Sequence, residues 1–202
     1  MLNKNYSILD VPFIFKVHDK GCILACVEMI LKYYDQKIDS DDLYRIFTKH
    51  KEGISLFEVV LKLIKFGYII GGGFTDHDIT LGANNLDELK LKTISSNIHK
   101  NSLSSYHEAI EVMENNNYFS IHALTLGDIK ESLNKKEPLI VNLLSGGKNE
   151  FMHSVCIIGQ NENDIIILNP PTVGKEFVPM ETFFNLHQRS GGYYIFIKRR
   201  ST

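Results

Sequence analysis

The sequence contains little cysteine, no long apolar run and no excess of one charge, and each absence excludes a class of protein. Three cysteines in 202 residues are too few, and odd in number, for a disulfide scaffold, so we expect free thiols in a reducing cytoplasm. Lys and Arg total 22 against 24 Asp and Glu, and this net charge of -2 argues against a nucleic-acid binder driven by bulk positive charge. The longest apolar runs, such as residues 165–168, are far too short to cross a bilayer, and the N-terminus lacks the apolar core of a signal peptide.

The remaining composition is that of a globular protein with a substantial core. Hydrophobic residues make up 44% and charged residues 23% of the chain. A length of 202 residues fits one ordinary domain, and no repeat period is present. We therefore expect a single domain over residues 1–202, without a membrane span and located in the cytoplasm.

The first third of the sequence predicts helices and the last third predicts strands. Apolar residues recur at spacings of three and four from Ile23, and Gly67 is expected to end the third of these helical segments. The predicted helices are followed by β-rich segments at residues 139–144, 153–159, 164–168, 175–178 and 193–198. This order predicts an α+β fold, with an N-terminal helical layer packed on a C-terminal antiparallel β-sheet and a cleft between the layers.

The middle of the chain has a weaker pattern. Residues 68–70 predict a strand that runs into a flexible corner at residues 71–73, which are all glycine. Residues 76–105 are expected to be loop with one short helix around residues 86–91, and two further helices are predicted at residues 106–113 and 126–133. Asp76, His77 and Asp78 are more typical of a solvated loop than of a metal site, because no partner cluster matches them.

Cys22 stands directly before the first strongly periodic helix. The positive end of a helix dipole and its unpaired amides favour a thiolate, which is what a cysteine nucleophile requires. An isolated cysteine on a helix is more often a small buried hydrophobe. Cys26, one turn later, is expected to be such a residue, because inside the helix it loses the terminal amides.

His153 and Asn169 lie at the ends of two consecutive predicted strands. A histidine at the beginning of a strand can act as general base for a thiol, although a structural role is commoner for a histidine taken alone. If the two strands form a hairpin, Asn169 returns to the neighbourhood of His153, where its amide can orient the imidazole. The alternative for Asn169 is an Asn-Pro turn that only closes the strand.

Taken together, these positions resemble the papain-like cysteine peptidases, and within them the bacteriocin-processing, double-glycine-cleaving peptidases and their stand-alone relatives. That branch has a stretch like Asp-Cys-Gly-x-Ala-Cys-Leu-x-Met-Ile-Leu-x-Tyr-Tyr, and residues 21–34 here read Gly-Cys-Ile-Leu-Ala-Cys-Val-Glu-Met-Ile-Leu-Lys-Tyr-Tyr. Later it has a strand such as Pro-x-Ile-Val, a histidine that opens an apolar strand, and Asp-Pro after the next strand. The corresponding residues here are 138–141, His153 and Asn169-Pro170. The resemblance extends from about residue 10 to residue 198, except in the middle of the chain.

The resemblance implies a papain-like fold and a catalytic triad of Cys22, His153 and Asn169. Two positions depart from the family pattern. Ile23 replaces the usual glycine after the nucleophile, and Lys16 replaces the usual glutamine that helps to stabilise the oxyanion. The resemblance therefore makes Lys16 a candidate for the oxyanion site, and His18 is a second candidate because it lies four residues before the nucleophile.

Three functions remain open at this point. The first is a cysteine peptidase or related thiol hydrolase that cleaves a peptide or amide bond in a peptide or protein substrate, without a metal or organic cofactor. The second is a degenerate peptidase-like domain that binds a peptide or protein partner without cutting it, which the residues at positions 16 and 23 favour. The third is acyl transfer by the same thiol. The sequence indicates neither the substrate nor the oligomeric state.

Overall fold

The computed structural model describes residues 7–15, 21–34, 40–47, 56–73, 119–120, 123–145, 151–172 and 174–198, together with single residues 108, 111, 112 and 115. Its helices are α1 (Cys22–Tyr33), α2 (Ser40–Phe47), α3 (Leu56–Lys65), α6 (Leu126–Asn134) and α7 (Met180–Arg189). Its strands are β1 (Ser7–Ile8), β2 (Ile69–Gly73), β3 (Phe119–Ser120), β4 (Leu139–Leu144), β5 (Met152–Gln160), β6 (Asp164–Leu168), β7 (Lys175–Pro179) and β8 (Tyr194–Lys198). The predicted α+β class is confirmed.

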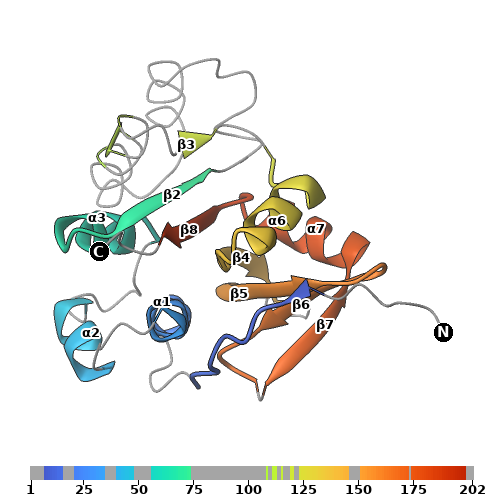
Figure 1. The fold of residues 1–202 in the computed structure, drawn as a ribbon, viewed down its shortest axis with the longest axis horizontal. Coiled ribbons are helices and arrows are strands. Elements are labelled where there is room, and N and C mark those ends of the chain that lie inside the picture. Colours follow the sequence, from blue (N-terminus) through green and yellow to red (C-terminus); the bar gives the residue numbers. More distant parts are fainter. Residues whose placement is uncertain are drawn as a thin grey trace.

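The strands form one sheet that is antiparallel through most of its width. Its central part has the order β2-β8-β4-β5-β6-β7, in which every neighbouring pair is antiparallel. β3 adds to the edge beside β2 in parallel, and β1 pairs with the end of β5. Figure 1 shows β2 lying beside β8 with α3 next to it, so a strand from the first half of the chain completes the sheet built by the second half.

The expectation of a flexible corner at residues 71–73 is wrong. These glycines continue β2 and pair with residues 194–196 of β8. A Cβ at Gly72 would lie only 2.3 Å from the carbonyl oxygen of Tyr194, so the missing side chain lets the two backbones approach closely. The glycines therefore allow close strand pairing. Composition alone does not distinguish glycines in such a strand from glycines in a turn.

The core lies between α1 and the middle of the sheet. Every residue of α1 from Ile23 to Leu31 is buried, and so are the four consecutive residues 155–158 of β5. Each fully buried aliphatic side chain contributes about 1.5–3 kcal/mol through burial alone, so α1 is anchored by its whole length. Within the described residues, no helix combines the length and the apolarity that a membrane crossing needs.

Most predicted elements of the last third are confirmed, and one helix was not predicted. The helix expected at residues 126–133 is α6, and the strands expected at residues 164–168 and 175–178 are β6 and β7. α7 was missed. It buries Phe183 and His187 and packs on β4, β6 and β7. The short helix expected around residues 86–91 lies outside the described residues, as does most of the helix expected at 106–113.

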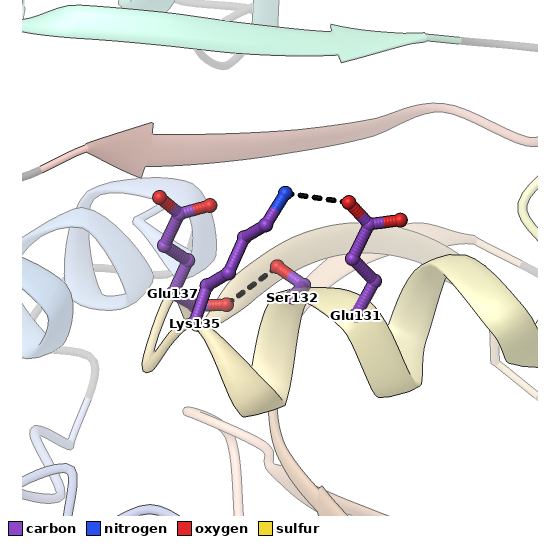
Figure 2. Close-up of polar contacts among 4 residues, drawn as sticks. All are labelled: Glu131, Ser132, Lys135 and Glu137. Carbon is purple, nitrogen blue, oxygen red and sulfur yellow. Dashed lines mark hydrogen bonds and ion pairs between the residues drawn. The ribbon is translucent and has the colours of Figure 1, made fainter.

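The connection from α6 to β4 is a tight helix-ending turn. Lys136 adopts φ 59°, the N–H of Glu137 donates to the carbonyl of Ser132 at 2.9 Å, and the N–H of Lys136 donates to that of Leu133 at 3.0 Å. Figure 2 shows the Ser132 hydroxyl donating to the Glu137 carbonyl, at 2.7 Å, and the exposed ion pair of Lys135 with Glu131. This is the pattern of a Schellman motif, with lysine at the left-handed position where glycine is usual.

We predict that Lys136→Gly stabilises the protein and that Lys130→Gly destabilises it. Glycine relieves the steric cost of a left-handed backbone, which we expect to raise the free energy of unfolding by about 0.5–1 kcal/mol. Lys130 is exposed inside α6, where glycine is expected to lower that free energy by about 1 kcal/mol. Urea unfolding of the two variants provides the measurement. Equal destabilisation by both variants would contradict this account of the turn.

Candidate active site

Cys22 is the first residue of α1, and its side chain is partly exposed. The first helical hydrogen bond joins the Ala25 N–H to the Gly21 carbonyl at 3.0 Å. The amides before Ala25 therefore have no acceptor within the helix, and the first turn carries no acidic residue. The Cys22 side chain therefore stands beside unpaired amides at the positive end of the helix dipole. Ile23 is only 4% exposed, so its side chain belongs to the core.

The other two cysteines are fully buried. Burial raises the pKa of the Cys26 thiol, and negative charge on Cys156 or Cys22 would raise it further. Burial also raises the pKa of the Cys156 thiol. Both side chains therefore stay protonated at neutral pH, as expected for structural cysteines.

α1 packs on β5, and one of its contacts lies near the beginning of the strand. Cys26 lies one turn after Cys22, and its Sγ is 3.5 Å from the carbonyl oxygen of Ser154 in β5. At the other end of the helix, the Tyr34 hydroxyl donates to the Lys136 carbonyl at 3.4 Å, just before β4. β4 then begins opposite Ile157. Cys22 therefore lies one helical turn from a residue that contacts the beginning of β5.

His153 is the second residue of β5, partly buried, and pairs with Leu143 of β4. Its imidazole centroid is 5.7 Å from the ring centroid of Phe151, which directly precedes the strand. Because side chains alternate along a strand, His153 and Val155 share one face, while Ser154 and Cys156 share the other. Cys156 therefore points to the face opposite His153.

Asn169 immediately follows β6, which is the hairpin partner of β5. The register pairs Cys156 with Leu168, and its continuation sets Asn169 opposite Val155. Asn169 therefore lies on the face that carries His153, as its diagonal neighbour on the next strand. The hairpin that the sequence analysis required is present.

The amide of Asn169 is held by a residue that the sequence analysis did not single out. Its Nδ2 donates to the two carboxylate oxygens of Glu176 in β7, at 3.1 and 3.4 Å. Its Oδ1 is buried and has no hydrogen-bond partner in the described part of the chain. The signal available in the sequence was a second hairpin, because β6 and β7 pair antiparallel and bring Glu176 back to the Asn-Pro turn.

A buried polar cluster supports the ends of β4 and β5 beside His153. The Ser154 hydroxyl donates to the Asn142 side chain at 2.8 Å, and the Asn142 backbone carbonyl lies 2.9 Å from Nδ1 of His187 and 2.7 Å from the Ser190 hydroxyl. Burial lowers the pKa of His187, so this imidazole is neutral at pH 7 and donates from Nδ1. These contacts link α7 to the sheet next to the strand that carries His153.

The two oxyanion candidates, Lys16 and His18, lie outside the described residues, as does the Asp76–Asp78 cluster. Over the chain segments that are described, no three His, Cys, Asp or Glu side chains gather closely enough to hold a metal ion. The chemistry available at the described site is that of a thiol, an imidazole and an amide.

The fold is shared with solved peptidase domains. The peptidase domain of Streptococcus ComA, a bi-functional ABC transporter involved in a quorum-sensing pathway, is 16% identical with a TM-score of 0.54, and the match covers 93% of this chain and 97% of that one. A double glycine motif protease from an AMS/PCAT transporter, solved in complex with the leader peptide, is 15% identical with a TM-score of 0.55, covering 96% and 94%. No curated protein matches the chain in sequence.

A family model described as the Peptidase_C39 like family matches residues 8–195, which is almost the whole chain. The match includes both the beginning of α1 and the β5–β6 hairpin. The earlier resemblance to double-glycine peptidases and their relatives is thereby confirmed at the level of the family. This protein belongs to the Peptidase_C39 like family.

Proposed function

We propose that this protein is a thiol hydrolase that cleaves a peptide or amide bond, with Cys22 as nucleophile, His153 as general base and acid, and Asn169 as the residue that orients the imidazole. The observation that carries the proposal is the packing of α1 on β5. Cys22 lies one turn before a helical residue that contacts the Ser154 carbonyl, and Ser154 directly follows His153. Asn169 lies on the face of His153, with a buried acceptor available.

The chemistry follows from these three groups. His153 takes the proton of Cys22, and the thiolate attacks the carbonyl carbon of the scissile bond. The imidazolium then protonates the leaving amine as the C–N bond breaks and a thioester forms. His153 next removes a proton from water, whose oxygen attacks the thioester, and the acid product leaves as the thiol is restored. Asn169 Oδ1, which has no partner among the described residues of the resting structure, is proposed to accept the other imidazole N–H during the reaction and to keep the ring in one orientation.

Developing negative charge on the carbonyl oxygen needs donors near Cys22. The Cys22 backbone N–H at the helix N-terminus is one, and Lys16 or His18 is proposed as the second. A lysine ammonium differs from a glutamine amide in reach and geometry, but it stabilises an oxyanion by the same electrostatic principle. The substrate class is a peptide segment, in keeping with the related protease that was solved with a leader peptide.

The competing function is peptide binding without cleavage. Lys16 at the usual glutamine position favours it, because a misplaced donor would leave the oxyanion unsupported. Ile23 favours it less than the sequence alone suggested. At 4% exposure its side chain fills the core, so it does not project into the path of a substrate.

We predict that Cys22 is the only thiol that iodoacetamide labels rapidly in the folded protein. Cys22 is partly exposed at the helix terminus, whereas burial keeps the other two thiols protonated and inaccessible. Mass spectrometry at neutral pH should find one label on the native protein and none on Cys22→Ala over the same time. Cys156→Ala is the control and should label like the native chain. Faster labelling of Cys26 or Cys156 would refute the helix-terminus argument.

We predict that Cys22→Ala and His153→Ala each lower peptide cleavage by at least about a thousandfold, because each removes a group that no other residue replaces. Digestion of a mixture of unstructured peptides, followed by mass spectrometry, measures the loss. Cys156→Ala should cleave at the native rate. A variant without Cys22 that still cleaves would show that the chemistry lies elsewhere.

We predict that either Lys16→Ala or His18→Ala lowers turnover by roughly a hundredfold, the usual effect of losing one oxyanion donor. Peptide binding should change much less, because that contact strengthens only as charge develops. Cleavage and binding are measured side by side for both variants. Unchanged turnover in both would reject the oxyanion assignment, and a native protein that binds peptides yet releases no product would establish the binding-only function.

A further inference from the structure

We propose that Glu176 is a positioning residue for the site: its carboxylate sets the orientation of the Asn169 amide and places a negative charge behind the His153–Asn169 pair. The inference rests on the proposed function, because it assigns a role relative to a catalytic His153. It adds a residue that neither the sequence pattern nor the likeness to known peptidases indicated.

The orientation of the amide follows from donor and acceptor chemistry. An ionised carboxylate only accepts hydrogen bonds, so the group of Asn169 that faces Glu176 must be its NH₂. The amide oxygen then points away from Glu176, where it is buried and has no partner within the described residues. Without the carboxylate, the amide can rotate by half a turn and present donors to the imidazole N–H. Glu176 removes that alternative.

The strand register places the three residues in one row across the sheet. β6 pairs with β7 so that Ile167 lies opposite Glu176, and Asn169 is two residues after Ile167. Glu176 and Asn169 therefore share a face, as diagonal neighbours on adjacent strands. The register between β5 and β6 sets His153 on that same face. The row thus runs from His153 through Asn169 to Glu176.

The turn after Asn169 holds this arrangement in place. The Thr172 N–H donates to the Asn169 carbonyl at 3.0 Å, which closes a turn through Pro170 and Pro171. The Thr172 hydroxyl lies 3.1 Å from the same carbonyl and also contacts the Glu176 carboxylate. The two prolines restrict the backbone of the turn. This limits the positions that Asn169 and Thr172 can take beside the Glu176 carboxylate.

The negative charge of Glu176 is expected to influence the protonation of the His153 imidazole. A carboxylate near the imidazole favours the imidazolium, and the imidazolium in turn favours the Cys22 thiolate. Removal of this charge should therefore raise the pH at which Cys22 becomes reactive. Because the Asn169 side chain lies between the carboxylate and the imidazole, we expect the midpoint pH of Cys22 alkylation to rise by about half a unit.

The test is the rate of Cys22 alkylation by iodoacetamide as a function of pH, measured on Glu176→Gln, Glu176→Ala and the exchange variant Asn169→Asp/Glu176→Gln. Glu176→Gln and Glu176→Ala should both shift the midpoint upward. The exchange variant keeps one carboxylate and one amide in contact and brings the negative charge closer to His153, so it should return the midpoint to the native value or below it. Glu162→Gln is the control, because Glu162 is exposed in the turn at the other end of the β5–β6 hairpin.

Thermal unfolding of each variant separates positioning from simple stabilisation, because a merely structural role would move the melting temperature without moving the midpoint. Native midpoints in both Glu176 variants, or no recovery in the exchange variant, would overturn the role of Glu176. His153→Ala tests the proposed function itself. A native midpoint in that variant would mean that no imidazole assists Cys22, and would overturn both proposals together.

Discussion

The structure depends on the packing of α1 along β5. The helix buries every residue from Ile23 to Leu31, and its Cys26 sulfur rests against the backbone of Ser154. Because a dense core does not tolerate sliding by a fraction of a turn, this contact also fixes the position of the residue that begins the helix. In the proposed site, core packing therefore sets the position of the nucleophile, because Cys22 begins the helix that is buried from Ile23 to Leu31.

The sheet then arranges the polar partners by register. Alternation along β5 and the two hairpins that follow it bring residues 153, 169 and 176 to one face, although they lie far apart in sequence. In the neighbouring strand β4, the backbone carbonyl of Asn142 is held by neutral His187 and Ser190. The groups that we propose to react therefore stand on elements held both by core packing and by buried hydrogen bonds, as preorganised catalysis requires.

The elements that could be predicted from the sequence are those marked by residues close together in the chain. The 3.6-residue period of residues 21–34, the cysteine at its beginning and the β-rich runs around His153 are all readable without a structure. Two features that depend on tertiary contacts were missed or misjudged. The glycines at residues 71–73 were expected to form a corner, because only the backbone of β8 shows why they lack side chains. Glu176 belongs to no recognisable sequence motif. Its contact with Asn169 depends on the pairing of β6 with β7, which cannot be predicted from any single residue. Lys16 and His18 lie outside the described residues, so their place in the oxyanion site stays a prediction from the sequence.

The most direct test of the account is the distance between the Cys22 sulfur and the nearer imidazole nitrogen of His153 in a crystal structure of the unmodified protein. The account requires a separation of about 4 Å or less, within the slightly loosened hydrogen-bond reach of a resting thiol and its base. A separation beyond about 6 Å, with α1 still packed on β5, would contradict it, because neither proton transfer nor an ion pair operates directly across that gap.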